Sequence, residues 1–199
     1  MLETFHLRAQ DYQSLPWKNG KGKTTEIAKD KSDPFLWRLS LASLLSSGPF
    51  SKYEGYDRIL VVLGGPGIGL IHEGKKERSL SSLVSYRFSG DVETTANVTE
   101  ACEDFNVLSL RKKTKAGVYP TYIGKNEDLQ FPLAGNEHFI FCLSGEITLH
   151  EANENKSYTL KERETFWFSR KTKKEFLNIR ARGVSERAVC LWIVIHSGE

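Results

Sequence analysis

Hydrophobic and polar positions alternate along most of the chain in short runs, which are separated by clusters of Gly, Asn, Ser and Asp. A period of two is typical of β-strands with one buried face, and clusters of turn-forming residues mark strand ends. No segment carries a long apolar stripe with helical spacing, and only residues 41–46 give a weak helical signal. Many short strands at hairpin-like spacing predict antiparallel sheets in sandwich or barrel form. The predicted strands are residues 24–29, 35–42, 58–63, 68–72, 85–89, 92–98, 105–110, 139–143, 146–151, 156–160, 165–168, 176–180 and 187–195.

The order of strands and turns repeats after a shift of 80 residues. Residues 58–65 (RILVVLGG) then lie over residues 138–145 (HFIFCLSG), and the aromatic residues 86–89 lie over residues 166–169. An apolar strand, a Gly turn, a second strand and an aromatic strand in this order resemble one half of a cupin. The repeat predicts two related halves that join near residues 111–126. This stretch opens with the basic run RKKTK, which is typical of a solvated linker.

Composition narrows the class of protein. The chain has 199 residues, which fits one large domain or two small fused ones. Hydrophobic residues make up 39% and charged residues 27%, which favours a folded globular protein over a disordered one. A net charge of +3 is too small to favour a nucleic acid or membrane partner. We find no signal peptide and no membrane span in the sequence, and expect a cytoplasmic protein.

Neither cysteine nor histidine spacing favours a metal site. Cys102, Cys142 and Cys190 form no CxxC motif, and we expect them to be small buried hydrophobic residues in a reducing compartment. None of the 5 histidines belongs to an H-x-H pair. His72 and His150 are each followed by Glu at nearly equivalent places in the two halves, but neighbours on a strand point to opposite faces. We therefore expect no metal ligands and no cofactor.

Short segments that resemble nucleotide-binding motifs lack the spacing or the flanking elements that those motifs require. The segment GKGKT at residues 20–24 lacks the first Gly of a phosphate-binding loop, with no strand before it and no helix after it. The segment GGPGIG at residues 64–69 has the wrong spacing for a dinucleotide site and is better explained as a tight hairpin turn. No G-x-S-x-G motif is present, and we assign no catalytic residue.

The first third of the chain carries polar residues on otherwise apolar strands. Strand alternation in residues 35–42 (FLWRLSLA) places Trp37 on one face and Arg38 and Ser40 on the other. An Arg that faces a barrel interior needs a partner, because an unpaired buried charge costs roughly several kcal/mol. We expect Glu26 to pair with Arg38, or else Asp57 or Asp104 to do so. The alternative is that the two faces of these strands are simply core and solvent.

These residues belong to segments that resemble the HutD/Ves family: PWKNGKGKTTEIA, FLWRLSLASLLSSGPFSKYEGYDRILVVLGG and DFNVLSLRKK. The family pattern is roughly W-x-N-x-x-G-x-T-x-E-I, W-R-x-S-x-A, G-P-F-S, G-x-D-R and D-F-N-V. Every element occurs here in order between Pro16 and Arg111. Lys21 departs from the pattern, since the family often has Gly there. From about Ala116 onward, only the strand pattern resembles the family.

The resemblance implies an all-β bicupin, with two cupin-like antiparallel β-barrels of the RmlC-like jelly-roll type in one chain. Residues 1–199 would form a single HutD/Ves bicupin domain, with an N-terminal cupin half of about 1–111 and a C-terminal half of about 116–199. Family members are linked with histidine utilisation in some bacteria and with stress responses in others, and their biochemical activity is not established. A role as a small-molecule sensor is the usual suggestion.

Our first hypothesis is a non-catalytic bicupin that binds a small anionic or polar metabolite, most simply a carboxylate. Arg38 and Arg58 would donate paired hydrogen bonds, because the planar guanidinium matches a carboxylate. Asn106 and Ser40 would orient the ligand, aromatic residues would wall the pocket, and carboxylates would hold the arginines. The candidate ligand-binding residues are Trp17, Asn19, Glu26, Trp37, Arg38, Ser40, Phe50, Asp57, Arg58, Asp104 and Asn106.

Two other functions stay open on the sequence alone. One is a metal-independent enzyme of isomerase or hydrolase type, with Glu26 or Asp104 as general base. The other is a scaffold or oligomerisation module whose polar strand faces serve only the fold. The sequence also leaves a homodimer open.

Overall fold

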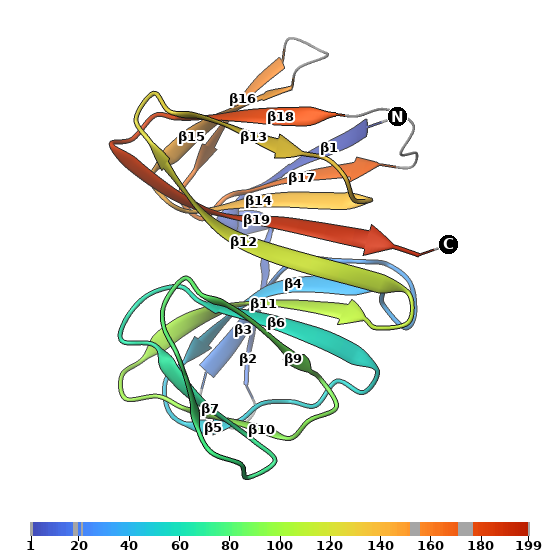
Figure 1. Cartoon of the computed structure of the whole chain (residues 1–199), viewed down its shortest axis with the longest axis vertical. Coiled ribbons are helices and arrows are strands. Elements are labelled where there is room, and N and C mark those ends of the chain that lie inside the picture. Colours follow the sequence, from blue (N-terminus) through green and yellow to red (C-terminus); the bar gives the residue numbers. More distant parts are fainter. Residues whose placement is uncertain (1, 18–19, 21, 152–155, 171–176, 199) are drawn as a thin grey trace. The chain divides into compact units, whose positions relative to one another are not determined.

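The computed structural model describes residues 2–17, 20, 22–151, 156–170 and 177–198, and nearly all regular structure in them is β-strand (Figure 1). The one helical element among these residues is a short 3-10 turn, η1 (Ala9–Asp11). No helix in the described part is long and apolar enough to cross a membrane. The chain divides into two compact units, Tyr12–Ala116 and Met1–Asp11 with Gly117–Gly198. The predicted all-β class is confirmed.

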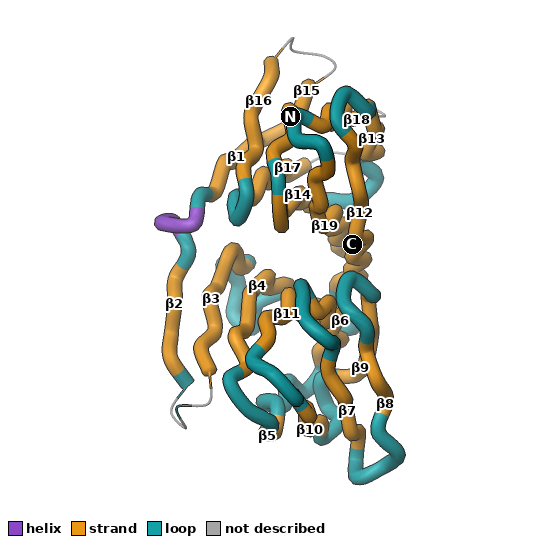
Figure 2. Tube along the Cα trace, turned by 90° about the vertical axis from the view of Figure 1, so that its left-hand side faces the viewer, coloured by secondary structure: helices purple, strands orange, loops and turns teal. Residues whose placement is uncertain are grey.

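The unit Tyr12–Ala116 contains two antiparallel sheets (Figure 2). The six-stranded sheet has the order β2 (Gln13–Pro16), β3 (Gly22–Lys29), β4 (Trp37–Leu44), β11 (Cys102–Leu110), β6 (Tyr56–Val62) and β9 (Ser85–Ser89). The four-stranded sheet has the order β5 (Gly48–Pro49), β10 (Thr94–Asn97), β7 (Ile68–His72) and β8 (Arg78–Leu80).

The second unit also contains two antiparallel sheets. The five-stranded sheet has the order β1 (Leu2–Leu7), β17 (Thr165–Arg170), β14 (Glu137–Ser144), β19 (Arg187–Ser197) and β12 (Thr114–Gly124). The four-stranded sheet has the order β13 (Asp128–Pro132), β18 (Asn178–Gly183), β15 (Glu146–Glu151) and β16 (Lys156–Lys161). Because β1 pairs with β17, the N-terminal strand belongs to a sheet that the C-terminal part of the chain builds.

The same strand order occurs in both units. The order β4-β11-β6-β9 of one large sheet corresponds to β12-β19-β14-β17 of the other, and β5-β10-β7-β8 corresponds to β13-β18-β15-β16. Each of these strands therefore has a counterpart eight labels later, which supports the duplication predicted from the 80-residue shift. In the described part of the chain the hydrogen-bonded ladders form four open sheets, whereas the sequence predicted closed barrels.

Two local predictions of secondary structure were wrong. Residues 41–46 do not begin a helix, because β4 runs to Leu44 and pairs with β3 on one side and β11 on the other. Residues 111–126 are not a linker, because most of them form β12. Its buried Thr114, Ala116 and Val118 alternate with less buried residues, so one face of the strand is buried. The turn at residues 111–113 and Lys115 within β12 carry the exposed side chains of the basic run.

Each unit has its own apolar core. In the unit Tyr12–Ala116 the core includes Leu44, Leu60, Val62, Ile68, Leu70, Leu80 and Ala96. In the second unit Cys142 and Cys190 are fully buried members of the core, as expected, whereas Cys102 is only partly buried. The cysteines are free.

The segment GGPGIG contains most of the turn between β6 and β7 and the first two residues of β7. These strands lie in different sheets, so the expected hairpin is wrong and the turn instead carries the chain from one sheet to the other. Gly67 has a φ of 95°, and a Cβ atom there would lie 2.2 Å from the carbonyl oxygen of Leu80. Gly64, in the same turn, has nothing within 4 Å of a Cβ position.

We expect Gly67→Ala to lower the free energy of unfolding by about 1–3 kcal/mol, because a side chain is strained in this conformation and clashes with Leu80. Gly64→Ala is the matched control and should change stability by no more than about 0.5 kcal/mol. Urea unfolding followed by tryptophan fluorescence measures both. Equal stability of the two variants would contradict this account of the turn.

Candidate ligand-binding site

A cavity of about 440 Å³ lies in the unit Tyr12–Ala116. The six-stranded sheet provides most of its wall, and the segment that contains β5 and the residues after it provides the rest. The lining residues are Pro16, Trp17, Thr24, Arg38, Ser40, Ala42, Pro49, Phe50, Ser51, Tyr53, Arg58, Asn106 and Leu108. Two of these side chains are cationic and none is a carboxylate.

Strand alternation and register bring the polar residues together. Leu108 on β11 pairs with Arg38 on β4 and with Arg58 on β6, so the two arginines lie on one face in the same cross-strand row. In the next row Asn106 pairs with Ser40. All of these residues line the cavity. The predicted separation of Arg38 and Ser40 from Trp37 follows from the same alternation.

Arg58 is a buried cation with an exposed fraction of 8%. Its Nε and Nη2 atoms both donate to Oδ1 of Asn106, at 2.8 and 2.5 Å. The guanidinium also lies over two aromatic rings, 4.3 Å from the centroid of Phe50 and 5.4 Å from that of Phe88. Burial lowers the pKa of Arg58, and the charge of Asp104 opposes that shift.

Asn106 connects Arg58 to a buried acid. The Nδ2 atom of Asn106 donates to Oδ1 of Asp104, which is fully buried. The Asn106 amide is fixed in this orientation because its oxygen already accepts from Arg58. Burial raises the pKa of Asp104 from an ordinary value of 3.8 to about 7, although Arg58 and Asn106 both act to lower it. Asp104 does not line the cavity, so it acts on a ligand only through its neighbours.

Arg38 has a different environment from the one predicted. Its Nη2 atom donates to the hydroxyl of Tyr53 at 2.9 Å, and the guanidinium lies 5.0 Å from the centroid of that ring. Its Nε atom is buried and has no hydrogen-bond partner among the described residues. The predicted pairing with Glu26, Asp57 or Asp104 is wrong: in the described part of the chain no carboxylate forms an ion pair with Arg38. A neutral phenol therefore leaves its positive charge uncompensated.

Three of the predicted residues point away from the cavity or lie at its margin. Trp37 is buried on the opposite face of β4. Asp57 is next to Arg58 and so faces the other way, where it accepts from Nε of Arg111 at 2.7 Å. Glu26 lies beside an irregularity in β3, does not line the cavity, and has Lys29 3.9 Å away. Asn19 lies outside the described residues.

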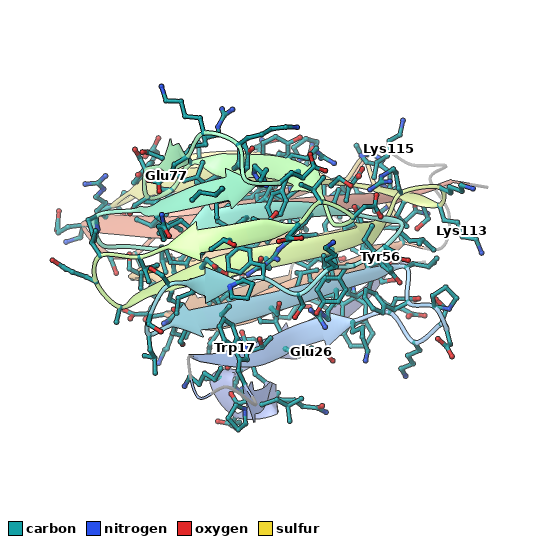
Figure 3. All side chains as sticks on the ribbon, turned by 90° about the horizontal axis from the view of Figure 1, so that it is seen from below. Trp17, Glu26, Tyr56, Glu77, Lys113 and Lys115 are labelled. Atoms are coloured by element: carbon teal, nitrogen blue, oxygen red, sulfur yellow. The ribbon has the colours of Figure 1, made fainter. Side chains whose placement is uncertain are left out.

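Trp17 and Phe50 are apolar walls of the cavity. The indole nitrogen of Trp17 donates to Oγ1 of Thr24 at 2.8 Å, which holds the ring against β3 (Figure 3). Gly22 makes this arrangement possible, since a Cβ atom there would lie 2.2 Å from the carbonyl oxygen of Ser43 and 3.0 Å from the Trp17 ring. The backbone nitrogen of Phe50 donates to the carbonyl oxygen of Thr94 at 2.8 Å, which fixes the opposite wall.

Sequence reasoning missed Tyr53 and Thr24. Tyr53 lies in an irregular segment, where no periodicity indicates which way a side chain points. Thr24 is on a predicted strand with the correct alternation, so the sequence offered a signal for it, but a single Thr carries little chemical information.

The histidines have structural partners. Nδ1 of His72 lies 2.9 Å from Oγ1 of Thr94, and Nε2 lies 3.1 Å from the hydroxyl of Tyr86. His150 pairs with Ser157 at 2.8 Å. Across the described residues, no group of three or more His, Cys, Asp or Glu side chains gathers as a metal site would require.

The family follows from a match over most of the chain. Residues 9–188 match the family model described as HutD. The chain belongs to the HutD family. An uncharacterised 21.2 kDa protein from the hutC 3' region of Pseudomonas putida is 41% identical over 55% of this chain and 60% of its own length. Protein Ves of Escherichia fergusonii is 31% identical over 54% of this chain and 60% of its own length. The match thus covers less than two thirds of these relatives.

Two solved structures share the fold over nearly the whole chain. A conserved protein of unknown function from Pseudomonas aeruginosa PAO1 has a TM-score of 0.88 at 28% identity, and HutD from Pseudomonas fluorescens SBW25 has a TM-score of 0.82 at 26% identity. Both comparisons cover 99% of this chain and 100% of the other. A cupin 2 conserved barrel domain protein from Leptotrichia buccalis, at 12% identity and a TM-score of 0.58, shows a cupin-like fold.

In this HutD-family chain we expect Asp104→Asn to become more stable relative to wild type as the pH rises from about 4 to about 7. The raised pKa means that the folded protein holds a proton that the unfolded chain releases across this range, so wild-type stability falls with pH. The expected slope is up to about 1.4 kcal/mol per pH unit. Urea unfolding at pH 4.5, 6 and 7.5 measures it.

Glu103→Gln is the control for this experiment. Glu103 is adjacent to Asp104 on β11 and therefore points to the other face of the sheet. It should retain the wild-type dependence on pH. A difference between Asp104→Asn and wild type that does not change with pH would mean that Asp104 is ionised throughout.

Proposed function

We propose that this HutD-family protein is a non-catalytic binding protein for a small carboxylate metabolite, through which it modulates histidine utilisation or a stress response. The observation that carries the proposal is the pair of arginine side chains in a cavity whose described lining contains no carboxylate. The names of the Pseudomonas putida and Pseudomonas fluorescens relatives supply the histidine-utilisation context. The similarity to protein Ves is the reason for proposing a stress response as the alternative.

The hydrogen bonds around the arginines favour an anion as ligand. A guanidinium has five N–H donors, and Arg58 directs two donor atoms to one amide oxygen. Arg38 keeps a buried Nε without a partner among the described residues. A carboxylate would accept from both guanidiniums and would offset the cost of burying their charge. No neutral ligand would supply that compensation.

The walls favour a small ligand. A volume of about 440 Å³ lies near the lower end of the usual range for small-molecule sites, roughly 300–1,000 Å³. Trp17, Phe50 and Tyr53 supply apolar surface beside the charged groups. Such surface limits access of water, which strengthens each charged hydrogen bond. A small anion with an apolar part fits this combination.

The two alternatives fit less well. Asp104 has a pKa near 7, which suits a general base, but its carboxyl lies behind Asn106 and outside the lining. Glu26, the other candidate base, does not line the cavity either. A pure scaffold would fill this space with the apolar side chains that fill the core beside it. A cavity with two cations at one end is a costly feature that a scaffold does not need.

The fold itself is proposed to be a bicupin, with one cupin-like barrel in each unit. The repeated strand order and the cupin-like relatives support this. The two sheets of each unit would then be the two sheets of one jelly roll.

We expect Arg38→Ala and Arg58→Ala each to abolish the thermal stabilisation that a bound carboxylate produces in the wild-type protein. Loss of a charge-assisted hydrogen bond costs about 1.5–3 kcal/mol, which is roughly a ten- to hundredfold loss of affinity. The measurement is Tm against concentration in a screen of small carboxylates, since a ligand raises Tm by mass action. Amides of the same shape serve as uncharged controls.

Lys112→Ala is the control variant, because Lys112 is an exposed cation in the turn before β12. It should respond to carboxylates like wild type. A merely structural role of the arginines would lower the Tm of their variants but leave the ligand-induced shift intact. That result would overturn the proposed function.

The proposal requires no metal, and we expect the Tm to stay the same when EDTA is added in excess. Stoichiometric metal in the purified protein, lost to EDTA together with a large fall in Tm, would contradict this. Elemental analysis before and after dialysis against EDTA provides the check.

A further inference from the structure

We propose that Asp104 couples binding of a carboxylate at Arg58 to the uptake of one proton, so that the site binds its anion more tightly when Asp104 is protonated. This inference rests on the proposed function, because it concerns the regulation of the same site. It adds a group that does not touch the ligand and acts through Asn106 and Arg58.

The geometry consists of three buried side chains in a chain of hydrogen bonds. Arg58 donates twice to Oδ1 of Asn106, and Nδ2 of Asn106 donates to Oδ1 of Asp104. The exposed fractions are 8%, 4% and 0%, so water does not screen the charges. Oδ2 of Asp104 is buried and has no hydrogen-bond partner among the described residues. A buried carboxylate oxygen without a donor favours the protonated acid over the anion.

An anion in the cavity changes the balance at Asp104. The positive charge of Arg58 acts on Asp104 and favours its ionised form. A carboxylate bound to Arg58 adds a second negative charge to the same guanidinium, and two like charges at one buried cation disfavour ionisation of the weaker acid. The pKa of Asp104, already raised to about 7, therefore rises further on binding. By linkage, the bound protein takes up a proton over the interval between the two pKa values.

The residues around Asp104 leave a clear pH window for a test. Its register partners, Ala42 on β4 and Val62 on β6, are apolar. The other charged or titratable groups are Arg58 on β6, Arg38 on β4, Tyr53 beside the cavity, Cys102 and Glu103 on β11, and His72 on β7 of the four-stranded sheet.

Two of these neighbours, Cys102 and His72, have shifted pKa values. Burial raises the pKa of Cys102 to about 11. Burial and, to a smaller extent, Arg78 lower the pKa of His72 below its ordinary 6.5. Above pH 7 His72 is therefore neutral, and a change of affinity between pH 7 and 9 is assigned to Asp104.

The experiment measures the dissociation constant of formate at half-unit steps from pH 6.5 to 9, at constant ionic strength. Formate is ionised throughout this range. The indole N–H signals of the 4 tryptophans in an NMR titration report binding, since Trp17 lines the cavity. We expect the dissociation constant to rise above pH 7 by up to about tenfold per pH unit and then to level off.

Two variants assign the effect. Asp104→Asn should bind formate with a dissociation constant that does not depend on pH, because the amide keeps the contact with Asn106 but does not titrate. Glu103→Gln should keep the wild-type dependence with at most a small shift of its midpoint. An unchanged dependence in Asp104→Asn overturns the proposal, because another group would then be the one that titrates.

A direct titration of the wild-type protein avoids reliance on the variant. Protein labelled with ¹³C at the Asp carboxyl groups reports the pKa of Asp104 with and without saturating formate, and we expect a higher value with formate. Equal values, or equal affinity at pH 6.5 and 9, overturn the coupling and leave the binding function standing. Failure of formate and of the wider carboxylate screen to bind at any pH overturns the proposed function as well.

Discussion

The burial of Arg58 is the constraint on which the arrangement of the six-stranded sheet depends. A guanidinium on the inner face of a sheet needs partners, and the protein supplies one amide and two aromatic rings but no ionised carboxylate in direct contact. The nearest acid, Asp104, is separated from it by Asn106. The cation is therefore held in place without being neutralised, and its charge stays available to an anion in the cavity.

The position of Arg58 on β6 lies between apolar core residues and the polar residues of the cavity. Leu60 and Val62, which follow Arg58 on the same face of β6, belong to the apolar core. Arg38 lies in the same cross-strand row as Arg58, Ser40 lies in the row of Leu60, and both line the cavity. One face of one sheet is thus divided into a core that stabilises the unit and a polar end that is suited to a ligand.

The two units carry different side chains at the position that corresponds to Arg58. Under the 80-residue shift, the counterpart of Arg58 is His138, which is 1% exposed and whose Nε2 accepts from the backbone nitrogen of Gly135 at 2.8 Å. Burial lowers the pKa of His138 to about 4, so it is neutral near pH 7. The core around it contains Phe166 and Phe168. The same strand order therefore supports a charged cavity in one unit and a neutral histidine at the matching position in the other.

The sequence by itself determined most of the strands, the family and the face on which Arg38, Ser40 and Arg58 lie, because alternation with a period of two is a local property, and it predicted the repeat. By the same rule it could have excluded Trp37 and Asp57 from the cavity. Only the tertiary structure decided that Tyr53 contacts Arg38 and that Asp104 lies behind Asn106. It also decided that β12 is a strand and that β1 joins the C-terminal unit. These outcomes depend on pairing between residues far apart in the chain, and the pattern within one strand carries no information about its neighbours.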